Sequence, residues 1–397
     1  MLQFSVCGAD TVATKTQESL EPFNRRLRSV DRSFQVVAIP WSDYRNELTR
    51  MAIYGQGMDV AQVGARLAND LQAMNALRPF TSAEIDALGG EAGFLPVAWK
   101  QTNRLVDGQV WTLPWLLDPR GFLYWRDMLE DAGIDEATAF QNAENTEETL
   151  QRLKAAGVEI PLALPVGNES LAGQASCSWV WQAGGDFVSA YGANVLFTEP
   201  AFLKGLGAYF RLAPYLYHKG GALQMVDDAN TLFMSRRAAV LYAGMWPVAD
   251  IIAERTHPLR SRLGLSVPSG PPITAGSNLA VWNFSRYETE AVNLVKYLLD
   301  REVQRQYPLR VDHLPVRTDV IEETPYSDDP ILAAFVQLAK KSRSFPNFQL
   351  CGLLEGMYNT AIRRIWSKIA AQPDAEIDVL IYQASQTLER RFRGWAS

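Results

Sequence analysis

The sequence predicts an α/β protein built from two lobes, and three observations support this prediction. The chain has 397 residues, and a chain of this length usually folds around two hydrophobic cores, not a single one. Hydrophobic residues make up 47% and charged residues 21% of it, the balance of a globular protein that buries its core without cross-links. Short apolar runs alternate with helical periodicities in the first third, which is typical of strands in a parallel sheet that helices cover on both faces.

The first third predicts a strand, helix and strand in succession. Residues 4–7 and 34–39 are apolar runs of strand length, and a proline ends the second run. Between them, apolar side chains recur at the spacing of one helix face, at Leu20, Phe23, Leu27 and Val30. A further helix ends near residue 54 at a pair of glycines and leads to a third buried strand over residues 59–63.

The pattern changes near residues 107–109, where a tight turn joins two short β-like runs, and we place a crossing between the lobes there. Helices dominate from this point to about residue 255, with an apolar strand at 240–243. After a loop rich in proline and glycine, residues 279–282 predict another strand. One helix then follows, with an inner face formed by Val292, Val295, Leu299 and Val303.

Charge and cysteine content argue against several classes of function. The formal net charge of −6 disfavours nucleic-acid binding, which needs clustered Lys and Arg. Cys7, Cys177 and Cys351 lie far apart, so the sequence predicts buried free thiols and neither a metal site nor a disulfide framework. Met1 leads directly into the first strand, so either the protein is cytoplasmic or this is a mature form with an added Met1.

Sequence-local catalytic signatures are absent, and we predict no cofactor, no metal and no catalytic residue. The three histidines, His218, His257 and His313, have no ligand or catalytic partner at a suitable spacing. The segment KGLGAYF at 204–210 begins like a dinucleotide fingerprint but lacks its third glycine, and it predicts a helix. A glycoside hydrolase needs only two carboxylates, so that chemistry stays open, with Asp107 and Asp118 as its carboxylates.

Tryptophan is the most informative residue type. The chain has 11, and several lie in turns or beside glycine and proline. The apolar face of a sugar ring packs on an aromatic plane, while its hydroxyls pair with Asp, Asn and Arg. The segment WLLDPR at 115–120 combines three such side chains. The alternative is that these tryptophans are core residues, which we expect of Trp125 and Trp181.

Several short segments also form a family pattern by their order and spacing. The segment GQGMDVAQV at 55–63 matches a turn and strand written G-x-x-P-D-V, with Met58 in place of the proline. DGQVWTLP at 107–114 matches D-G-K-x-Y-G-L-P, and RAAVLYAGMW at 237–246 matches G-x-A-A-M-x-x-x-G-x-W. YWRDMLEDAGI, GSNLA and LPVRTD match later segments, at residues 124–134, 276–280 and 314–319. With these segments, the chain resembles the family 1 extracellular solute-binding proteins of ABC transporters over almost its whole length.

The resemblance implies a periplasmic-binding-protein-like fold of type II, with two α/β lobes joined by hinge crossovers and the ligand cleft between them. The N-terminal lobe is expected to contain residues 1–113 and 263–315. The C-terminal lobe is expected to contain residues 114–262 and 316–397, with hinges near 108–114 and 262–267. No chemistry is expected on the solute.

The aromatic pattern and the resemblance together predict a set of ligand-binding residues. They are Trp41, Tyr44, Arg66, Trp115, Asp118, Arg120, Trp179, Trp246, Asn278, Arg317 and Glu355. Trp246 matches the tryptophan that stacks on sugars in several family members. The three arginines leave open a phosphodiester or another anionic solute in place of a neutral sugar.

The resemblance therefore implies the substrate-binding protein of an ABC importer, which binds a carbohydrate and delivers it to the membrane permease. We expect a monomer in the periplasm or another extracytoplasmic compartment, with its signal segment removed. A lipid anchor stays open, although Cys7, inside a predicted strand, does not fit a lipidation site. The alternatives are an anionic small solute and a carbohydrate-active hydrolase.

Overall fold

The computed structural model describes the whole chain except residues 101–107, 190–193, 218–221, 267–269, 349–350 and 397. The predicted turn at 107–109 and the run before it therefore lie partly outside the described residues. The chain divides into two compact units. Unit 1 consists of Met1–Asp118, Ala275–Asp329 and Asn347–Gly352, and unit 2 of Pro119–Thr274, Pro330–Pro346 and Leu353–Ser397.

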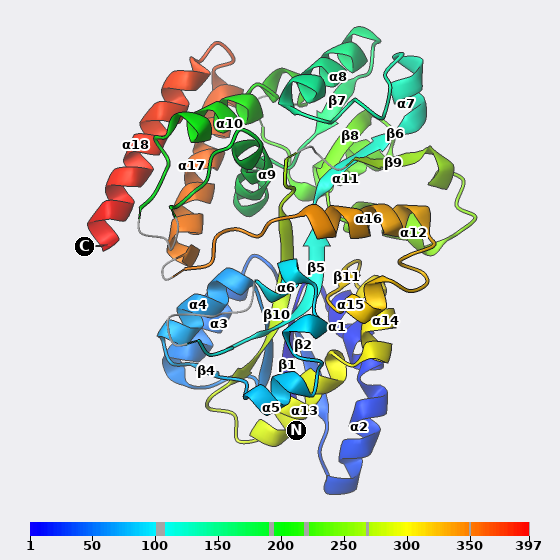
Figure 1. Cartoon of the computed structure of the whole chain (residues 1–397), viewed down its shortest axis with the longest axis vertical. Helices are drawn as coiled ribbons and strands as arrows, with labels where there is room; N and C mark the ends of the chain where they lie inside the picture. Colours follow the sequence, from blue (N-terminus) through cyan, green and yellow to red (C-terminus); the bar gives the residue numbers. More distant parts are fainter. Residues whose placement is uncertain (101–107, 190–193, 218–221, 267–269, 349–350, 397) are drawn as a thin grey trace. The chain divides into compact units, whose positions relative to one another are not determined.

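Unit 1 is built on a mixed sheet with the strand order β11-β5-β10-β3-β1-β2, and β4 pairs with β10 (Figure 1). The strands are β1 (Leu2–Cys7), β2 (Phe34–Ile39), β3 (Val60–Val63), β4 (Leu77–Arg78), β5 (Leu113–Pro119), β10 (Thr274–Trp282) and β11 (Leu314–Pro315). β1 runs parallel to β2 and β3, which confirms the predicted βαβ unit. The parallel pairing predicted from the first third of the chain is thus confirmed, and the later strands make the sheet mixed, because β10 is antiparallel to β3 and β11 to β5.

Two helices that the apolar spacing predicted in unit 1 are divided into shorter helices in the structure. The helices of unit 1 are α1 (Asp10–Ser19), α2 (Glu21–Leu27), α3 (Tyr44–Tyr54), α4 (Ala65–Ala73), α5 (Ser82–Asp86), α6 (Pro96–Trp99), α13 (Glu288–Leu298), α14 (Arg301–Arg310) and α15 (Thr318–Ile321). Pro22 starts α2 as a separate helix, and Val30, predicted on its inner face, is 58% exposed. Asp300 accepts a hydrogen bond from the Glu302 amide and starts α14, which divides the helix predicted over 292–303.

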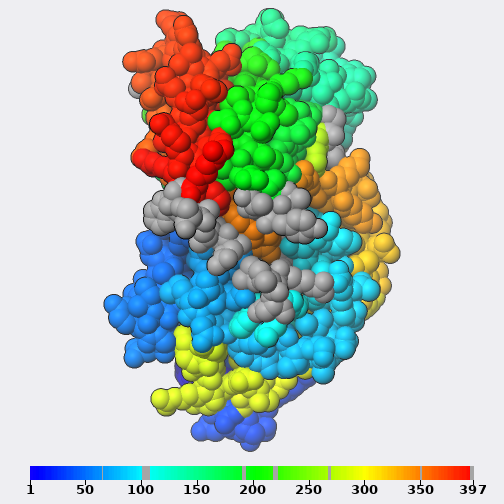
Figure 2. Space-filling model, turned by 60° about the vertical axis from the view of Figure 1, so that its left-hand side comes forward, coloured from blue at the N-terminus to red at the C-terminus, as the bar shows by residue number. Residues whose placement is uncertain are grey.

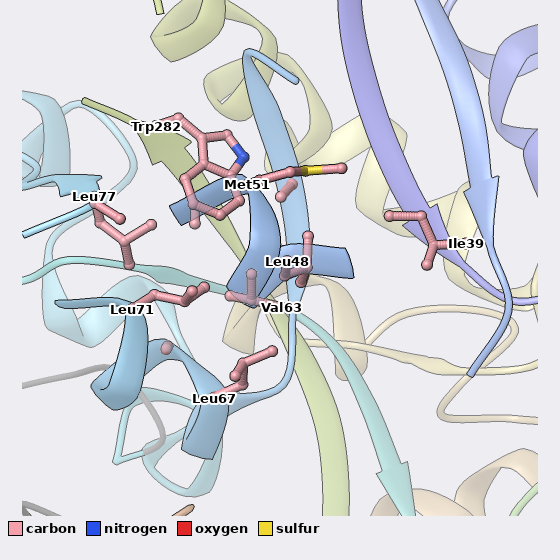
Figure 3. Close-up of a cluster of buried hydrophobic side chains, with 12 residues drawn as sticks. Ile39, Leu48, Met51, Val63, Leu67, Leu71, Leu77 and Trp282 are labelled. Atoms are coloured by element: carbon pink, nitrogen blue, oxygen red, sulfur yellow. The ribbon is translucent and has the colours of Figure 1, made fainter. Parts of the chain in front are cut away.

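One hydrophobic cluster of unit 1 shows why its helices form where they do (Figure 3). Leu48 and Met51 of α3 lie one turn apart, as do Leu67 and Leu71 of α4. Each pair therefore lies on one face of its helix, and these side chains pack with Val63 of β3 and Trp282 of β10. Fully burying one such aliphatic side chain contributes about 1.5–3 kcal/mol to folding.

Unit 2 is built on a four-stranded sheet with the order β7-β8-β6-β9. Its strands are β6 (Gly121–Trp125), β7 (Ile160–Ala163), β8 (Ala238–Ala243) and β9 (Leu263–Ser266). β7 and β8 are parallel, and β6 is antiparallel to both β8 and β9. The predicted strand at 240–243 is confirmed as part of β8.

Helices make up most of the remainder of unit 2. They are α7 (Arg126–Asp131), α8 (Ala143–Ala155), α9 (Glu169–Gln182), α10 (Pro200–Phe210), α11 (Val226–Met234), α12 (Ala249–Ala253), α16 (Pro330–Lys341), α17 (Cys351–Ala371, its first two residues in unit 1) and α18 (Ile377–Ala396). The helix predicted over 204–210 is confirmed within α10, and α18 packs beside it, as the red and green segments of Figure 2 show. Among the described residues, no helix has both the length and the apolar character needed to cross a bilayer.

The division into units differs from the predicted lobes at several places. Residues 114–118 and 347–352, which we assigned to the C-terminal lobe, belong to unit 1. β9 pairs with β6 in unit 2, although we assigned residues from 263 onward to the N-terminal lobe. α15 packs with α14 in unit 1, although we assigned residues from 316 onward to the C-terminal lobe. The first two crossings between units therefore follow residues 118 and 274, outside the predicted hinges at 108–114 and 262–267.

Candidate functional site

Three predicted residues of unit 1 follow the ends of parallel strands. β1, β2 and β3 run in the same direction, so their carboxyl ends meet at one edge of the sheet. Trp41 and Tyr44 follow β2, and Arg66 lies in the first turn of α4 after β3. The structure thus places these three predicted ligand residues at the same edge of the sheet. In open α/β sheets, ligands usually bind at this edge, where the parallel strands end.

Trp41 and Tyr44 form an exposed aromatic pair at this edge. Trp41 is 51% exposed, and its ring meets that of Tyr44 edge to face, with 5.3 Å between the centroids. A Cβ atom on Gly64 would lie 3.3 Å from the Tyr44 hydroxyl, so this tyrosine reaches from the end of β2 to the end of β3. An exposed indole held by a neighbouring ring is suited to contact the apolar face of a ligand.

Asn278 and Asp118 lie in strands of unit 1 and are nearly buried. Asn278 is opposite Val63 at the end of β3, and its Nδ2 donates a hydrogen bond of 2.9 Å to Thr112 Oγ1. Asn278 is 1% exposed and Asp118 8%. Asp118 belongs to unit 1, whereas we expected it in the C-terminal lobe. Their ligand roles remain predictions.

A polar network lies beneath this edge and was not predicted. The Gln62 side chain accepts a hydrogen bond from the Cys7 amide and donates one to Ser277 Oγ, at 2.8 and 2.9 Å. It therefore links β1, β3 and β10. Burial raises the pKa of the Cys7 thiol to about 12, so this thiol is neutral and unreactive at physiological pH. Gln62 lies inside an apolar strand, and spacing alone does not distinguish it from a solvent-facing residue.

The second group of predicted residues lies at one edge of the unit 2 sheet. Gly121 at the start of β6 is opposite Ala243 at the end of β8, and Phe122 is opposite Ser266 at the end of β9. This register places the start of β6 beside the ends of β8 and β9. Arg120, just before β6, and Trp246, just after β8, therefore meet at this edge.

Arg120 and Trp246 are in direct contact. The Arg120 guanidinium lies over the Trp246 ring, 4.9 Å from its centroid, in a cation–π geometry. Arg120 is 9% exposed, and its backbone amide donates to the Ile273 carbonyl at 3.0 Å. The pair combines an aromatic plane with a fixed cation, the side-chain types predicted for ligand recognition.

The loop after β7 reaches the same edge and was not predicted. β7 is parallel to β8, so its carboxyl end lies beside that of β8. The Gln224 side chain accepts a hydrogen bond from the Leu164 amide, and the Gln224 carbonyl accepts one from Gly167, at 3.1 and 2.8 Å. Asn168 then caps α9. The sequence pattern did not predict β7, so nothing indicated that a loop follows the end of a strand here.

Three predicted ligand residues have structural roles instead. Trp115 is fully buried in unit 1, stacked on Tyr307 and edge to face with Phe4. Trp179 is 5% exposed in unit 2 and packs among buried aromatic rings. We correct both predictions, because core packing already surrounds these two indoles. The prediction that Trp125 and Trp181 are packed is confirmed by their burial.

Arg317 is the third corrected prediction. Its Nε and Nη2 donate to the two carboxylate oxygens of Asp319, and Nη1 donates to the carbonyls of Leu88 and Leu299. The guanidinium thus joins three segments of unit 1 and has little capacity left for a ligand. Glu355 of α17 is 6% exposed in unit 2, and its ligand role remains a prediction.

No metal cluster is found in the part of the chain that the structure describes, counting groups of three or more His, Cys, Asp or Glu side chains. His218 and Asp107 lie outside that part. Cys7, Cys177 and Cys351 are buried free thiols, as predicted.

The fold matches that of several solved structures. It is that of the two-lobed binding proteins, and the match to the sugar-binding protein MalE of Xanthomonas citri covers 100% of this chain and 98% of that chain, with a TM-score of 0.82 and 18% identity. The maltose-bound MalE3 of T. maritima matches over 98% of each chain, with a TM-score of 0.82 and 17% identity.

The sequence comparison places the chain within a family. Residues 18–334 match the family described as bacterial extracellular solute-binding protein, and the chain belongs to that family. A binding protein of Brucella abortus is 21% identical over 336 residues, which cover 83% of this chain and 79% of the relative. Members of this family are binding proteins of the extracytoplasmic space.

Proposed function

We propose that this protein is the solute-binding component of an ABC importer and that its solute is a carbohydrate. The observation that supports this most directly is the Arg120–Trp246 pair at the edge of the unit 2 sheet. Trp41 and Tyr44 offer a second aromatic surface on unit 1. An indole plane suits the apolar face of a sugar ring, and a guanidinium suits its oxygen atoms.

The proposed role is binding without chemistry. A solute that contacts both units stabilises the arrangement in which both sets of contacts are made, by its differential affinity for that arrangement. The permease of the importer then receives the solute. We further propose that the protein acts as a monomer, that a signal segment directs its export, and that its lobe crossings act as hinges.

A thermal-shift screen tests this proposal. A ligand that binds only the folded state stabilises it by about 2.7 kcal/mol at one hundred times its Kd. We expect a clear shift with one class among neutral mono- and disaccharides, polyols, uronic acids and glycerophosphodiesters. The shift should shrink in Trp246→Ala and persist in a variant of an exposed residue far from either edge, such as Tyr382→Ala. No shift with any compound would contradict carbohydrate binding.

An anionic solute is the second candidate, because Arg120 places a fixed cation against Trp246. If the solute is a uronic acid or a phosphodiester, it should raise the melting temperature of wild type but not that of Arg120→Gln. Neutral sugars should then shift the melting temperature of neither protein. If a neutral sugar gives the shift, the acidic compounds should be inert at equal concentration.

A further inference from the structure

A cavity of about 540 Å³ lies within unit 2, separate from the proposed carbohydrate site. It is lined by residues of the loop before β9, by β9 itself, by Arg126 and by the first turns of α16. Leu263 of β9 lies opposite Trp125 at the end of β6. Arg120 and Trp246 lie at the other end of these strands, and neither lines the cavity.

The lining is strongly cationic. Arg126, Arg255 and Arg260 contribute guanidinium groups, His257 contributes an imidazole, and no Asp or Glu is among the lining residues. This contrasts with the acidic balance of the chain, whose formal net charge is −6. Guanidinium groups that line one concave surface repel one another, so an anion bound between them is stabilised.

The contacts of three basic side chains define their positions. Arg260 Nη1 donates to the Ile251 and Ile252 carbonyls, at 2.6 and 3.0 Å, and these two bonds hold the guanidinium in place. His257 Nδ1 accepts a hydrogen bond of 3.2 Å from the Leu259 amide, so in the neutral imidazole Nε2 bears the proton and is the donor. Arg126 forms an ion pair with Glu136, which is not a lining residue.

Arg255 differs from these residues. It lies in an exposed loop and forms no ion pair or hydrogen bond within the described ranges of the chain. Its charge is therefore available to a ligand. Arg guanidinium groups match the planar oxygen edges of phosphate and carboxylate, and a phosphate can accept from several of them at once.

The remaining lining is apolar. Leu263, Leu265 and Ile331 face the cavity, together with Pro258 and Ala334. The volume greatly exceeds that of a bare oxyanion and lies in the range of small-molecule sites. A ligand that fills it combines an anionic group with an apolar body.

We propose that this cavity is a second binding site, which takes a small organic phosphate. The phosphate is held by the arginines and His257, and its organic part lies against Leu263, Leu265 and Ile331. The proposal does not depend on carbohydrate binding at the other end of the sheet.

Isothermal titration calorimetry with inorganic phosphate and with phenyl phosphate, at constant ionic strength, tests the proposal. We expect saturable binding of both, with phenyl phosphate several-fold tighter because its ring meets the apolar wall. Arg255→Gln should weaken both about tenfold, the usual effect of losing one hydrogen bond to a charged group. Arg286→Gln is the matched control, because Arg286 is an exposed arginine of unit 1, and it should bind as wild type.

Three results would overturn the proposal. The first is the absence of saturable binding by wild type, and the second is equal weakening by Arg255→Gln and Arg286→Gln. The third is loss of phosphate binding in Trp246→Ala, which would place the anion at the proposed carbohydrate site. Titration with a glutamate-rich peptide completes the design. Binding of the peptide without binding of either phosphate would assign the cavity to an acidic protein segment.

Discussion

Tryptophans in this chain serve two purposes, and burial separates them. Trp115 is fully buried against Tyr307 and Phe4, whereas Trp41 is 51% exposed beside Tyr44. We predict that Trp115→Ala lowers the free energy of unfolding by about 3–5 kcal/mol, because it leaves a cavity in the core of unit 1. Trp41→Ala should change it by less than about 1 kcal/mol. Urea denaturation followed by circular dichroism measures both, and similar losses in the two variants would contradict these assignments.

Arg317 and Asp319 predict a pH dependence of stability. The hydrogen bonds from the Arg317 guanidinium lower the pKa of the Asp319 carboxyl below its usual value. A carboxyl with a lowered pKa in the folded state stabilises that state above its unfolded pKa, about 3.9, and this contribution disappears as the pH falls through the folded pKa. Asp319→Asn should therefore melt below wild type near pH 7, and the difference should narrow below about pH 4. A difference independent of pH would contradict the ion pair.

Residues that follow strand ends were predictable, because strand ends are readable in the sequence. Trp41 follows β2, and Trp246 follows β8. Trp115 was misassigned because Pro114 suggests a turn, whereas the structure keeps that proline inside β5. Trp179 was misassigned because α9 is buried on all sides from residue 172 to residue 181, including its Ser and Gln side chains. A helix buried on every face has no polar stripe that distinguishes a core position from a ligand-facing one.

At the scale of elements, α9 and α10 cross at a glycine. A Cβ atom on Gly205 would lie 2.5 Å from the Val180 Cα, so an alanine there forces the two backbones apart. On Gly207 of the same helix, the nearest atom to a Cβ would be an Arg211 side-chain nitrogen at 3.5 Å. The two glycines of the KGLGAYF segment thus have different surroundings.

We predict that Gly205→Ala destabilises the protein by about 1–3 kcal/mol or more, through overpacking of the α9–α10 contact. Gly207→Ala should be neutral or stabilise by up to about 1 kcal/mol, because alanine has the higher helix propensity. Thermal unfolding of the two variants side by side measures the difference. Equal melting temperatures would show that the helices do not cross as closely as described.

The kinds of element were more predictable than their pairing. Apolar runs and helical periodicity correctly indicated β1, β2, β3 and β8. Strand direction and partner depend on where the chain returns from the other unit. Nothing local to β9 shows that it joins β6, and nothing local to β10 shows that it lies antiparallel to β3. The lobe boundaries were displaced for this reason.

At the scale of the whole molecule, the family match identifies a protein that binds a solute. Two edges, one on each unit, present an exposed or partly buried tryptophan after the end of a strand. We propose that both edges serve one solute. Binding should therefore depend on residues of both units and leave the solute chemically intact.

The most direct test is calorimetric titration with the compound that gives the largest thermal shift. The solute is then recovered from the calorimeter cell and analysed by chromatography. We expect one solute per chain, recovered unchanged. Trp41→Ala and Trp246→Ala should each weaken binding about tenfold, since losing one aromatic platform costs about 1–2 kcal/mol. Recovery of a cleaved solute, or wild-type affinity in both variants, would contradict the proposal of a carbohydrate-binding protein that uses these two edges.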